Sequence, residues 1–441
     1  MKLYPDTKVY LLCPGNVQTG GPESLHQLAS QLISFGVSAY MLYYPLGEYP
    51  FNKEDPVHDF YRKYHVPYVL EPEDNKKNIL IAPEALTESL FFYKKIRRVI
   101  WWMSVNNYLV HIKNNMESYL KNPLGMPLFK YFSFGKEDED ITHFAQSEYT
   151  RQFLRLNGIK KMYNVETHMS QTFLSRIADV DLSAKKNFVA FNPSKGYALT
   201  KAFMQLAPQI NWKPIYNMTS QQVQALLAES KVYIDFGEFP GRERLPREAA
   251  LSGCVVIVGK RGAAVNDVDV NIPAEFKFDI KETQPHQVIQ KIVEVFNDFE
   301  TAYAKQKAFQ DKERNAQRNF AAQVAAAFEI KKSVWGNIAL AQKFSGGTAV
   351  LLEKLKTNPL KPAFIVDENI NAENVLHEQK RNYLRAGGML IEIITPADAK
   401  FLYLEGRIKN FALLNPTDAE FADMKNFYAV KDEDLIIFNE Q

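Results

Sequence analysis

Short apolar runs alternate with amphipathic segments along most of the chain. Runs of about four to eight apolar residues, many of them β-branched, predict buried strands. Apolar residues spaced three and four positions apart predict helices between these runs. The first such helix carries one apolar face, made of Leu25, Leu28, Ala29, Leu32 and Ile33. This alternation is typical of βαβ units, so we predict an α/β protein with parallel sheets.

The predicted strands form two successive series, each of a size that suits one Rossmann-like domain. We expect the first domain to span residues 1–182 and the second, which contains long helices from Pro285 to about residue 335, to span 183–345. The first series comprises 9–13, 37–44, 78–82, 98–103 and 143–146. The second comprises 188–191, 213–216, 232–236, 255–258 and 275–278.

A third segment, residues 360–441, has four further strand-like runs, FIVD, LIEIIT, FALLN and LIIFNE. Helix-like stretches such as residues 371–388 separate them. The pattern predicts a small α/β module of about 80 residues, near the lower limit for an independent domain. Since the module carries no motif with recognisable chemistry, we expect it to serve stability or an interaction.

Composition narrows the class of protein. A chain of 441 residues exceeds the size of a single core, which agrees with several domains. Its 53 basic and 51 acidic residues nearly cancel, so we expect no nucleic-acid partner, and a site for a polyanion must be local. Cys13 and Cys254 lie in apolar runs and are read as buried small residues in a reducing compartment.

No apolar run reaches the ~18 residues that span a bilayer, and we expect a cytoplasmic protein. Residues 91–102 mix basic and aromatic side chains, as peripheral membrane segments do. The same residues also fit a core strand, which we favour. Contact with the inner face of a membrane remains a further expectation.

A glycine-rich bend, GNVQTGGPESLHQL, follows the first predicted strand. Gly20 and Gly21 permit a positive φ and close approach to the backbone, and Pro22 suits the first position of a helix. The helix N-terminus would then receive an anion or a sugar hydroxyl, and Glu23 beside it is a candidate acceptor-side residue. A tight turn that binds nothing is the alternative.

Basic residues gather in three loops that follow strands of the second series. Strands of a parallel sheet end at one edge, so these loops are expected to converge. Arginine forks match phosphate oxygens, and glycine-bearing loops hold phosphate through backbone N–H groups. Arginines paired on the surface with Glu238 and Glu243 are the alternative. The candidate donor-site residues are Lys195, Arg242, Arg244, Arg247, Glu248, Lys260, Arg261 and Gly262.

Residues 8–300 resemble the bacterial group-1, family 4-like glycosyltransferases of capsule and lipopolysaccharide gene clusters. The resemblance is carried by TGGPESLHQLASQL, WWMSVNNY, HFAQSEYTRQFLRLNGI, FNPSKG and DFGEFPGRERLPREAALSGCVVIVGKRGAA, in that order. It implies a GT-B fold, in which two Rossmann-like domains face a cleft. It also implies that Gly20 and Gly21 lie next to donor phosphates and acceptor, that Lys195 binds the donor diphosphate and that Glu248 holds the donor ribose.

Two departures from the family pattern concern the donor site. The family's common pair of glutamates, separated by seven intervening residues, is broken, because Pro240 stands eight positions before Glu248. The arginine that often precedes the family's lysine is also missing, with Ala190 and Asn192 nearby. The three arginines at 242, 244 and 247 could supply the lost phosphate contacts.

The acceptor is expected on the side of the first domain, where Ser104, Asn106, Asn107 and Glu84 follow predicted strands. An inverting reaction needs a general base, for which Glu84 and His111 are candidates, whereas a retaining reaction needs none. No aspartate pair of the metal-binding kind accompanies the phosphate loops, so we expect no metal. We expect no cofactor, since a nucleotide-sugar donor would be a substrate.

The sequence therefore predicts a glycosyltransferase that moves a sugar from a nucleotide-linked or otherwise phosphate-activated donor to a glycan or lipid-linked acceptor. A nucleotide-sugar epimerase, which would act without an acceptor, is one alternative. A non-catalytic scaffold that binds a nucleotide or glycan is another.

Overall fold

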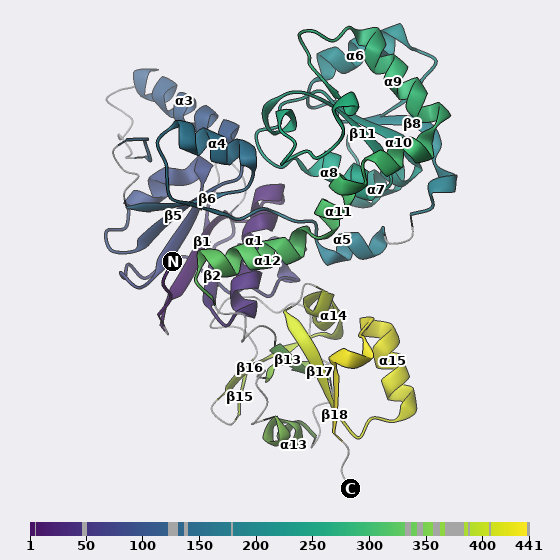
Figure 1. Cartoon of the computed structure of the whole chain (residues 1–441). Helices are drawn as coiled ribbons and strands as arrows, with labels where there is room; N and C mark the ends of the chain where they lie inside the picture. The colour runs from purple at the N-terminus through teal and green to yellow at the C-terminus, as the bar shows by residue number, and fades with distance from the viewer. Residues whose placement is uncertain are drawn as a thin grey trace. The chain divides into compact units, whose positions relative to one another are not determined.

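The first sheet has a Rossmann-like strand order in the computed structural model, β3-β2-β1-β4-β5-β6-β7. Figure 1 labels four of its strands, β1, β2, β5 and β6. β1 and β2 run parallel in register, with Lys8 beside Ser38 and Pro14 beside Tyr44. The order reverses between β1 and β4, which is where such sheets bind ligands. The strands are β1 Lys8–Pro14, β2 Ser38–Tyr44, β3 Tyr68–Val69, β4 Ile79–Pro83, β5 Arg97–Trp102, β6 Ile141–Ala145 and β7 Met162–Asn164.

The structure describes residues 1–4, 6–45, 51–121, 131–135, 140–177, 180–330, 337–341, 347–355, 362–366, 383–386, 389–404 and 407–438. Within them, contacts define two units, one of Met1–Val99 with Val324–Gln441 and the other of Ile100–Gln323. The helices of the first sheet are α1 Gly20–Ser34, α2 Asp59–Arg62, η1 Glu84–Phe91, α3 Val105–Lys121, α4 Glu148–Leu156 and α5 Gln171–Arg176.

The second sheet has the order β12-β11-β10-β8-β9, and its neighbouring strands run parallel. In chain order this is the doubly wound arrangement 2-1-3-4-5 read from the other edge, and its ligand position lies between β8 and β10. The strands are β8 Lys186–Phe191, β9 Asn211–Pro214, β10 Ser230–Asp235, β11 Val255–Gly259 and β12 Lys277–Phe278, and the helices between them include α6 Tyr197–Leu206, α7 Ser220–Glu229, α8 Arg244–Leu251 and η3 Gly262–Val265.

The core of this second sheet is built from fully buried β-branched side chains. Val232, Ile234, Val256 and Val258 have no more than 1% of their surface exposed. They alternate with Tyr233, Val255 and Ile257, which are also buried, so both faces of the central strands are covered. This explains the continuous apolar runs in the sequence and confirms the predicted α/β class with parallel sheets.

The long helical pattern after Pro285 is divided into four helices. Breaks at Asp298, Gln306 and Asn315 separate them, and the Gln306 side chain bonds the backbone of Val256 on β11. The helices are α9 Pro285–Asn297, α10 Phe299–Lys305, α11 Lys307–Arg314 and α12 Ala316–Ala327.

The third sheet, order β15-β16-β14-β13-β17-β18, is a small Rossmann-like sheet with an antiparallel edge. All four predicted strands of this module are present. Residues 383–386 form strand β15, so the predicted helix is wrong there, and most of 371–388 lies outside the described residues. The elements are β13 Asn337–Leu340, α13 Gly347–Lys354, β14 Pro362–Val366, β15 Tyr383–Ala386, β16 Met389–Ile394, α14 Pro396–Leu404, β17 Ile408–Leu414, α15 Asp418–Tyr428 and β18 Leu435–Phe438.

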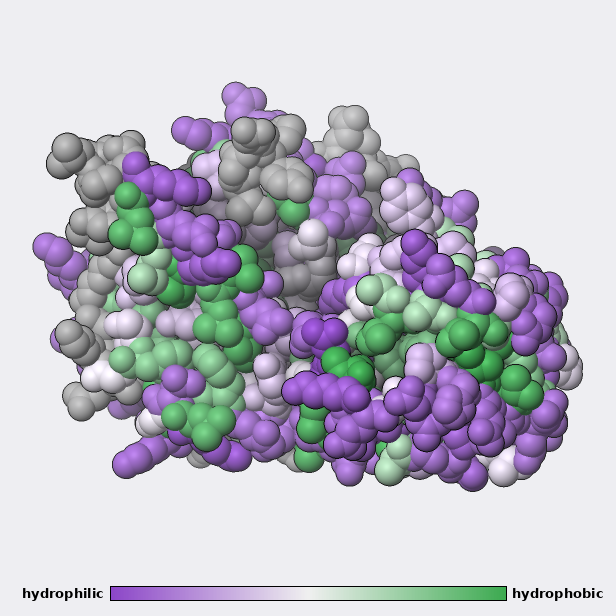
Figure 2. Space-filling model, turned by 90° about the horizontal axis from the view of Figure 1, so that it is seen from above, coloured by the Kyte–Doolittle hydropathy of each residue, from purple (hydrophilic) through white to green (hydrophobic). Residues whose placement is uncertain are grey.

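The surface is mixed in polarity. Figure 2 shows polar side chains over much of one face, with separate groups of apolar side chains between them. Four apolar residues of α3, Leu109, Val110, Met116 and Leu120, are at least half exposed. No described helix combines the length and the apolar character that crossing a bilayer requires.

Candidate functional site

Three loops converge where the order of the second sheet reverses. Residues 192–196 follow β8, residues 236–243 follow β10, and residues 260–262 follow β11. Gly196 has a φ of +61°, and a Cβ there would lie 2.5 Å from the carbonyl carbon of Phe236. Gly262 has a φ of +53°, and a Cβ there would lie 2.1 Å from the carbonyl oxygen of Phe239. The first and third loops therefore both pack against the middle loop, and only glycine fits at these contacts.

Half-exposed cations of these loops are held by neighbouring carboxylates. Lys195 Nζ lies 2.6 Å from Glu243 Oε2, just before α8 begins. Arg244, the first residue of α8, donates through Nε to Oε1 of Glu248, one turn further along the helix, at 2.5 Å. The side chain of Lys195 is 35% exposed and that of Arg244 is 44% exposed, so both remain accessible from solvent.

The third loop adds two more basic residues. Arg261 forms an ion pair with Glu238 of the middle loop. Lys260 is exposed, and its ammonium has no carboxylate partner within the described part of the chain. The sequence left open that the arginines pair with Glu238 and Glu243 instead of binding a ligand. Glu238 does pair with an arginine, whereas Glu243 pairs with Lys195.

Arg242 and Arg247 are buried and share one carboxylate, that of Glu313 on α11. Arg242 NH2 donates to Glu313 Oε1 and Arg247 Nε to Glu313 Oε2, each at 2.6 Å. Arg242 also pairs with Glu166, and Arg247 donates to the carbonyl and hydroxyl oxygens of Thr167. Direct contact with a donor, which the sequence suggested for both arginines, does not fit this interior position.

Burial and neighbouring charge shift two pKa values in this cluster. Burial lowers the pKa of Arg242 to about 10, despite the nearby Glu313. Burial alone would raise the pKa of Glu313, but the two arginines outweigh it and hold that pKa below its usual range. Arg242 and Glu313 therefore stay charged at neutral pH, and the buried carboxylate compensates the buried guanidinium.

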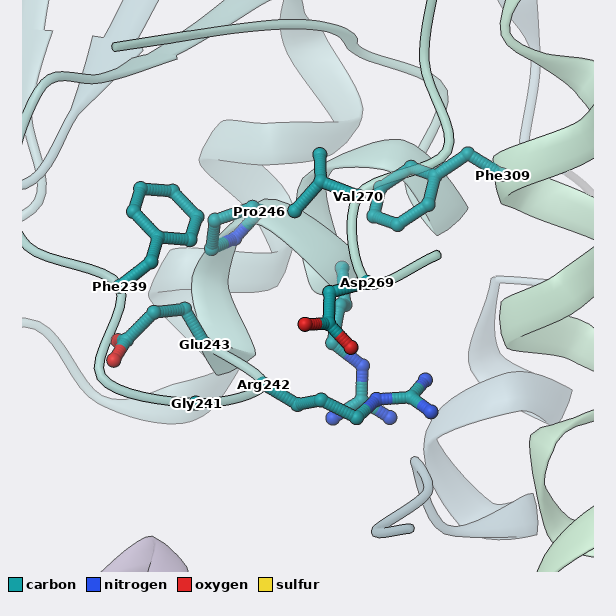
Figure 3. A pocket seen from close by; sticks show the side chains of 9 residues that line it. Phe239, Gly241, Arg242, Glu243, Pro246, Asp269, Val270 and Phe309 are labelled. Carbon is teal, nitrogen blue, oxygen red and sulfur yellow. The ribbon is translucent and has the colours of Figure 1, made fainter. Parts of the chain in front are cut away.

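A small pocket lies beside the buried arginines, and it is too small for a nucleotide. Its volume is about 10 Å³, room for roughly one water molecule. In Figure 3, the Glu243 carboxylate and the Arg242 guanidinium point in opposite directions from neighbouring positions of the chain. The pocket is lined by Phe239, Gly241, Arg242, Glu243, Pro246, Arg247, Asp269, Val270 and Phe309.

Asp235, the last residue of β10, lies directly before the middle loop and was not predicted from the sequence as part of the candidate site. Its Oδ1 accepts the Gly237 N–H at 2.9 Å, and its Oδ2 accepts the Tyr233 hydroxyl at 3.1 Å. Burial raises its pKa to about 6, a change that Glu243 reinforces and Lys195 opposes. A carboxylate at the end of a predicted strand, in IDFG, was the available signal.

The middle loop also touches the ends of β5 and β6 in the first sheet. Val105 N–H donates to the carbonyl oxygen of Pro240 at 3.2 Å, and Arg242 N–H donates to Gln146 Oε1 at 3.3 Å. Asp269 accepts the N–H groups of Glu148 and Tyr149 at the start of α4, at 2.8 and 2.9 Å. Strand ends of both sheets are therefore joined through residues 240–242.

Ser104, Asn106 and Asn107 lie at this junction, next to the start of α3. Ser104 and Asn106 are partly buried, and Asn107 is exposed. The Asn107 N–H contacts the Ser104 hydroxyl at 3.3 Å. These three residues are thus close in the chain to Val105, whose N–H donates to the middle loop. Their role in binding an acceptor stays a prediction.

The glycine bend after β1 differs from its predicted geometry. Neither Gly20 nor Gly21 has a positive φ, because α1 already begins at Gly20 and Pro22 is its third residue. A Cβ on Gly20 would meet nothing within 4 Å, so the space beside it is open. Glu23 is 6% exposed and accepts the Tyr64 hydroxyl at 3.2 Å, which makes it an interior residue of the bend.

The two candidate bases occupy different environments. Glu84 is 1% exposed and begins η1 directly after β4, where the first sheet reverses its order. His111 is partly buried on α3, and its Nε2 lies 3.0 Å from Asn115 Nδ2, one turn further from the strand ends. Seven residues into a helix, His111 is about 9 Å along the axis from Val105. Either role stays a prediction.

Among the described residues, no three His, Cys, Asp or Glu side chains are grouped as metal ligands. Glu313 was not predicted from the sequence, since nothing in FQDKERNA distinguishes it from a solvated helix residue. Its importance follows from α11 packing against α8, which brings Glu313 to arginines 66 and 71 residues earlier.

No protein-family model and no curated protein matches the sequence. Solved structures similar to this chain include a glycosyltransferase from Rickettsia africae, with 15% identity, a TM-score of 0.46 and coverage of 74% of this chain and 98% of that chain. Sucrose-phosphate synthase from Thermosynechococcus elongatus has 11% identity, a TM-score of 0.47 and coverage of 73% and 98%.

Anabaena Alr3699/HepE in complex with UDP-glucose is also similar, with 13% identity, a TM-score of 0.46 and coverage of 73% and 98%. Identities of 11–15% and TM-scores below 0.5 carry no functional argument. The function proposed below therefore depends on this chain's own residues.

Proposed function

We propose that the protein is a glycosyltransferase whose donor is a sugar linked to a nucleoside diphosphate or a similar phosphate. The observation that carries this proposal is the convergence of three loops at the β8/β10 position of the second sheet, with Lys195, Arg244 and Lys260 accessible there. A pyrophosphate needs both cations and backbone N–H groups, and glycine-bearing loops at strand ends supply both.

Lys195 is the residue that we expect to bind the diphosphate. Its present partner is the Glu243 carboxylate at 2.6 Å, and a phosphate oxygen would replace that carboxylate without a change of charge on the lysine. Glu248, which Arg244 holds in the first turns of α8, would accept hydrogen bonds from ribose hydroxyls in this proposal. Arg261 and Lys260 would lie along the phosphates from the third loop.

Catalysis would come from stabilising the negative charge that develops on the leaving phosphate. As the bond to the sugar breaks, negative charge grows on the bridging oxygen, and fixed cations stabilise that state more than the bound donor. Arg242 and Arg247 act differently in this account. Held by Glu313, they position the middle loop rather than contact the donor.

The acceptor, for which we propose a surface glycan or a lipid-linked sugar, would approach from the side of Ser104, Asn106 and Asn107. The Val105 N–H, which donates to the Pro240 carbonyl oxygen of the middle loop, supports this proposal. The anomeric configuration of the product decides between the two reaction courses. An inverted product would require a base such as Glu84 or His111, and a retained product would not.

A panel of nucleotide sugars and phosphoribosyl pyrophosphate, screened by thermal shift, should identify the donor because selective binding raises apparent stability. Release of the nucleotide is then measured with and without candidate acceptors. We expect slow hydrolysis of the donor alone and faster release with an acceptor. Binding without any release would instead support a scaffold, and a new sugar isomer without acceptor would support an epimerase.

The variant Lys195→Ala should weaken donor binding about 10- to 100-fold, the effect of losing one charge-assisted contact to phosphate. Lys201→Ala is the matched control, because Lys201 is an exposed lysine on α6 close to the same loop. Equal donor affinity in the two variants would place the donor elsewhere.

A further inference from the structure

The C-terminal module, which has no motif of its own, contacts the segment that supports the glycine bend of the first sheet. Both lie in the unit formed by Met1–Val99 and Val324–Gln441. Arg407, 1% exposed at the start of β17, donates through NH1 to the carbonyl oxygens of Tyr64 and His65, the latter at 3.1 Å. A buried guanidinium aimed at two backbone carbonyls fixes the path of that segment.

A second contact comes from the first turn of α14. Asp398 Oδ2 lies 3.0 Å from His65 Nε2 and also accepts the Thr395 hydroxyl at 2.6 Å. His65 has a φ of +46°, which non-glycine residues rarely adopt, so its conformation needs support from its surroundings. Phe401 of α14 packs edge-on against Tyr64, with ring centroids 5.1 Å apart.

The same segment reaches the glycine bend from its other side. The Tyr64 hydroxyl donates to Glu23, and the Tyr61 hydroxyl donates to the carbonyl oxygen of Thr19 at 2.8 Å. Thr19 N–H donates back to the Tyr61 oxygen at 3.0 Å, which matters because the Thr19 side chain does not cap α1. Tyr61 also stacks on His26 of α1, with ring centroids 4.3 Å apart.

We propose that Asp398 and Arg407 are positioning residues, through which the C-terminal module holds residues 61–65 and thereby the backbone at 19–23. Tyr64 contacts both the module, through Phe401, and the bend, through Glu23, and Tyr61 adds a second contact to the bend. The effect on turnover rests on the proposed function together with the expectation from the sequence resemblance that the bend lies next to donor phosphates and acceptor. The effect on the bend itself does not, and it can be measured without any substrate.

Hydrogen exchange of the full-length chain tests the contact directly. In Asp398→Ala, we expect amides at 19–25 to exchange about five-fold faster, the change that corresponds to ~1 kcal/mol of local opening free energy. Protection of β17 should be unchanged, which shows that the module is folded. Asp418→Ala, which removes an exposed aspartate from the first turn of α15, is the matched control and should leave the bend as it is.

Unchanged exchange at 19–25 in Asp398→Ala would overturn the proposal. Arg407→Met provides a second test that survives loss of the module's fold. If β17 loses protection in this variant, the bend must lose protection too, and a bend that stays protected would also overturn the proposal. Arg407→Lys keeps a donor and should restore most of the protection lost in Arg407→Met.

Turnover adds a readout that general loss of structure would not mimic. With the donor found by the panel, Asp398→Ala should raise the KM for donor or acceptor about five-fold while kcat changes less, since the bend binds substrate without taking part in the chemistry. An unchanged KM together with altered exchange would retain the contact between module and bend and would contradict the placement of substrate there.

Discussion

At the scale of single residues, charges of the second sheet's loops divide into two kinds that look alike in the sequence. Arg242 and Arg247 are interior, because Glu313 compensates both. Lys195 and Arg244 are half-exposed and paired with carboxylates of their own loop or helix. The sequence identified the basic cluster, but local composition could not show which cations face solvent. That distinction depends on α11, more than sixty residues away.

Removing one member of the buried cluster should destabilise the fold strongly. For Glu313→Gln we expect a loss of about 3–5 kcal/mol in unfolding free energy, because two buried guanidinium groups would lose their shared counter-charge. Chemical denaturation measures this loss. Arg247→Ala should cost a similar amount, so the variant is unsuitable as a simple probe of donor binding.

Arg318→Ala is the control for this comparison, since Arg318 is an exposed arginine on the neighbouring helix α12. It should change the unfolding free energy by less than about 0.5 kcal/mol. A loss of similar size in Arg318→Ala and Arg247→Ala would show that burial of the cluster contributes little.

Asp235 should make stability depend on pH between about 4 and 6. Its folded-state pKa of about 6 lies above the ordinary value of 3.8, mainly because of burial. A raised pKa means that the folded state favours the protonated form. Its contribution is therefore full below pH 4 and is lost as the pH rises through 6, by up to about 3 kcal/mol.

Denaturation of the wild type and Asp235→Asn across this range checks the sign. In the asparagine variant, position 235 no longer titrates. The unfolding free energy of the variant minus that of the wild type should therefore rise from pH 4 to pH 6.5. A difference that stays constant, or one that falls, would contradict a raised pKa for Asp235.

At the scale of elements, apolar periodicity predicted the positions of most strands, but it did not predict the geometry of the loops. The predicted runs at 9–13, 188–191 and 255–258 all lie inside observed strands, because buried parallel strands need continuous apolar sequence. The short strands β3 and β7 were missed, since two or three residues carry no period. Pro22 was placed at the wrong helix position because glycines 20 and 21 already adopt helical geometry.

Two glycines should respond in opposite ways to substitution by alanine. Gly262→Ala introduces a Cβ 2.1 Å from the Phe239 carbonyl oxygen at a positive φ, and it should destabilise the protein by more than about 1 kcal/mol. Gly20→Ala meets open space at a helix start and should be neutral or stabilising by up to about 1 kcal/mol.

Thermal denaturation of both variants measures this difference. A Gly20→Ala variant that unfolds as readily as Gly262→Ala would mean that the first bend is as constrained as the third loop of the second sheet. The contrast would then not follow from the φ angles and close contacts described above.

At the scale of the whole molecule, the α/β class and the two successive series of strands could be predicted from the sequence. The strand order could not, because apolar runs do not specify their neighbours. The candidate site between β8 and β10 could be located only from the sheet topology. The predicted domain limits at 182 and 345 remain predictions. In residues 360–441 the short apolar runs predicted strands, but they gave no indication of the Rossmann-like order of the third sheet.

The central claim is that a donor diphosphate binds across three loops of the second sheet. Hydrogen exchange of the full-length chain, with and without the nucleotide sugar that the panel selects, tests this most directly. The account predicts donor-dependent protection at 192–197, 236–244 and 259–263, which disappears in Lys195→Ala and persists in Lys201→Ala. Protection that avoids these three segments, or that survives unchanged in Lys195→Ala, would contradict it.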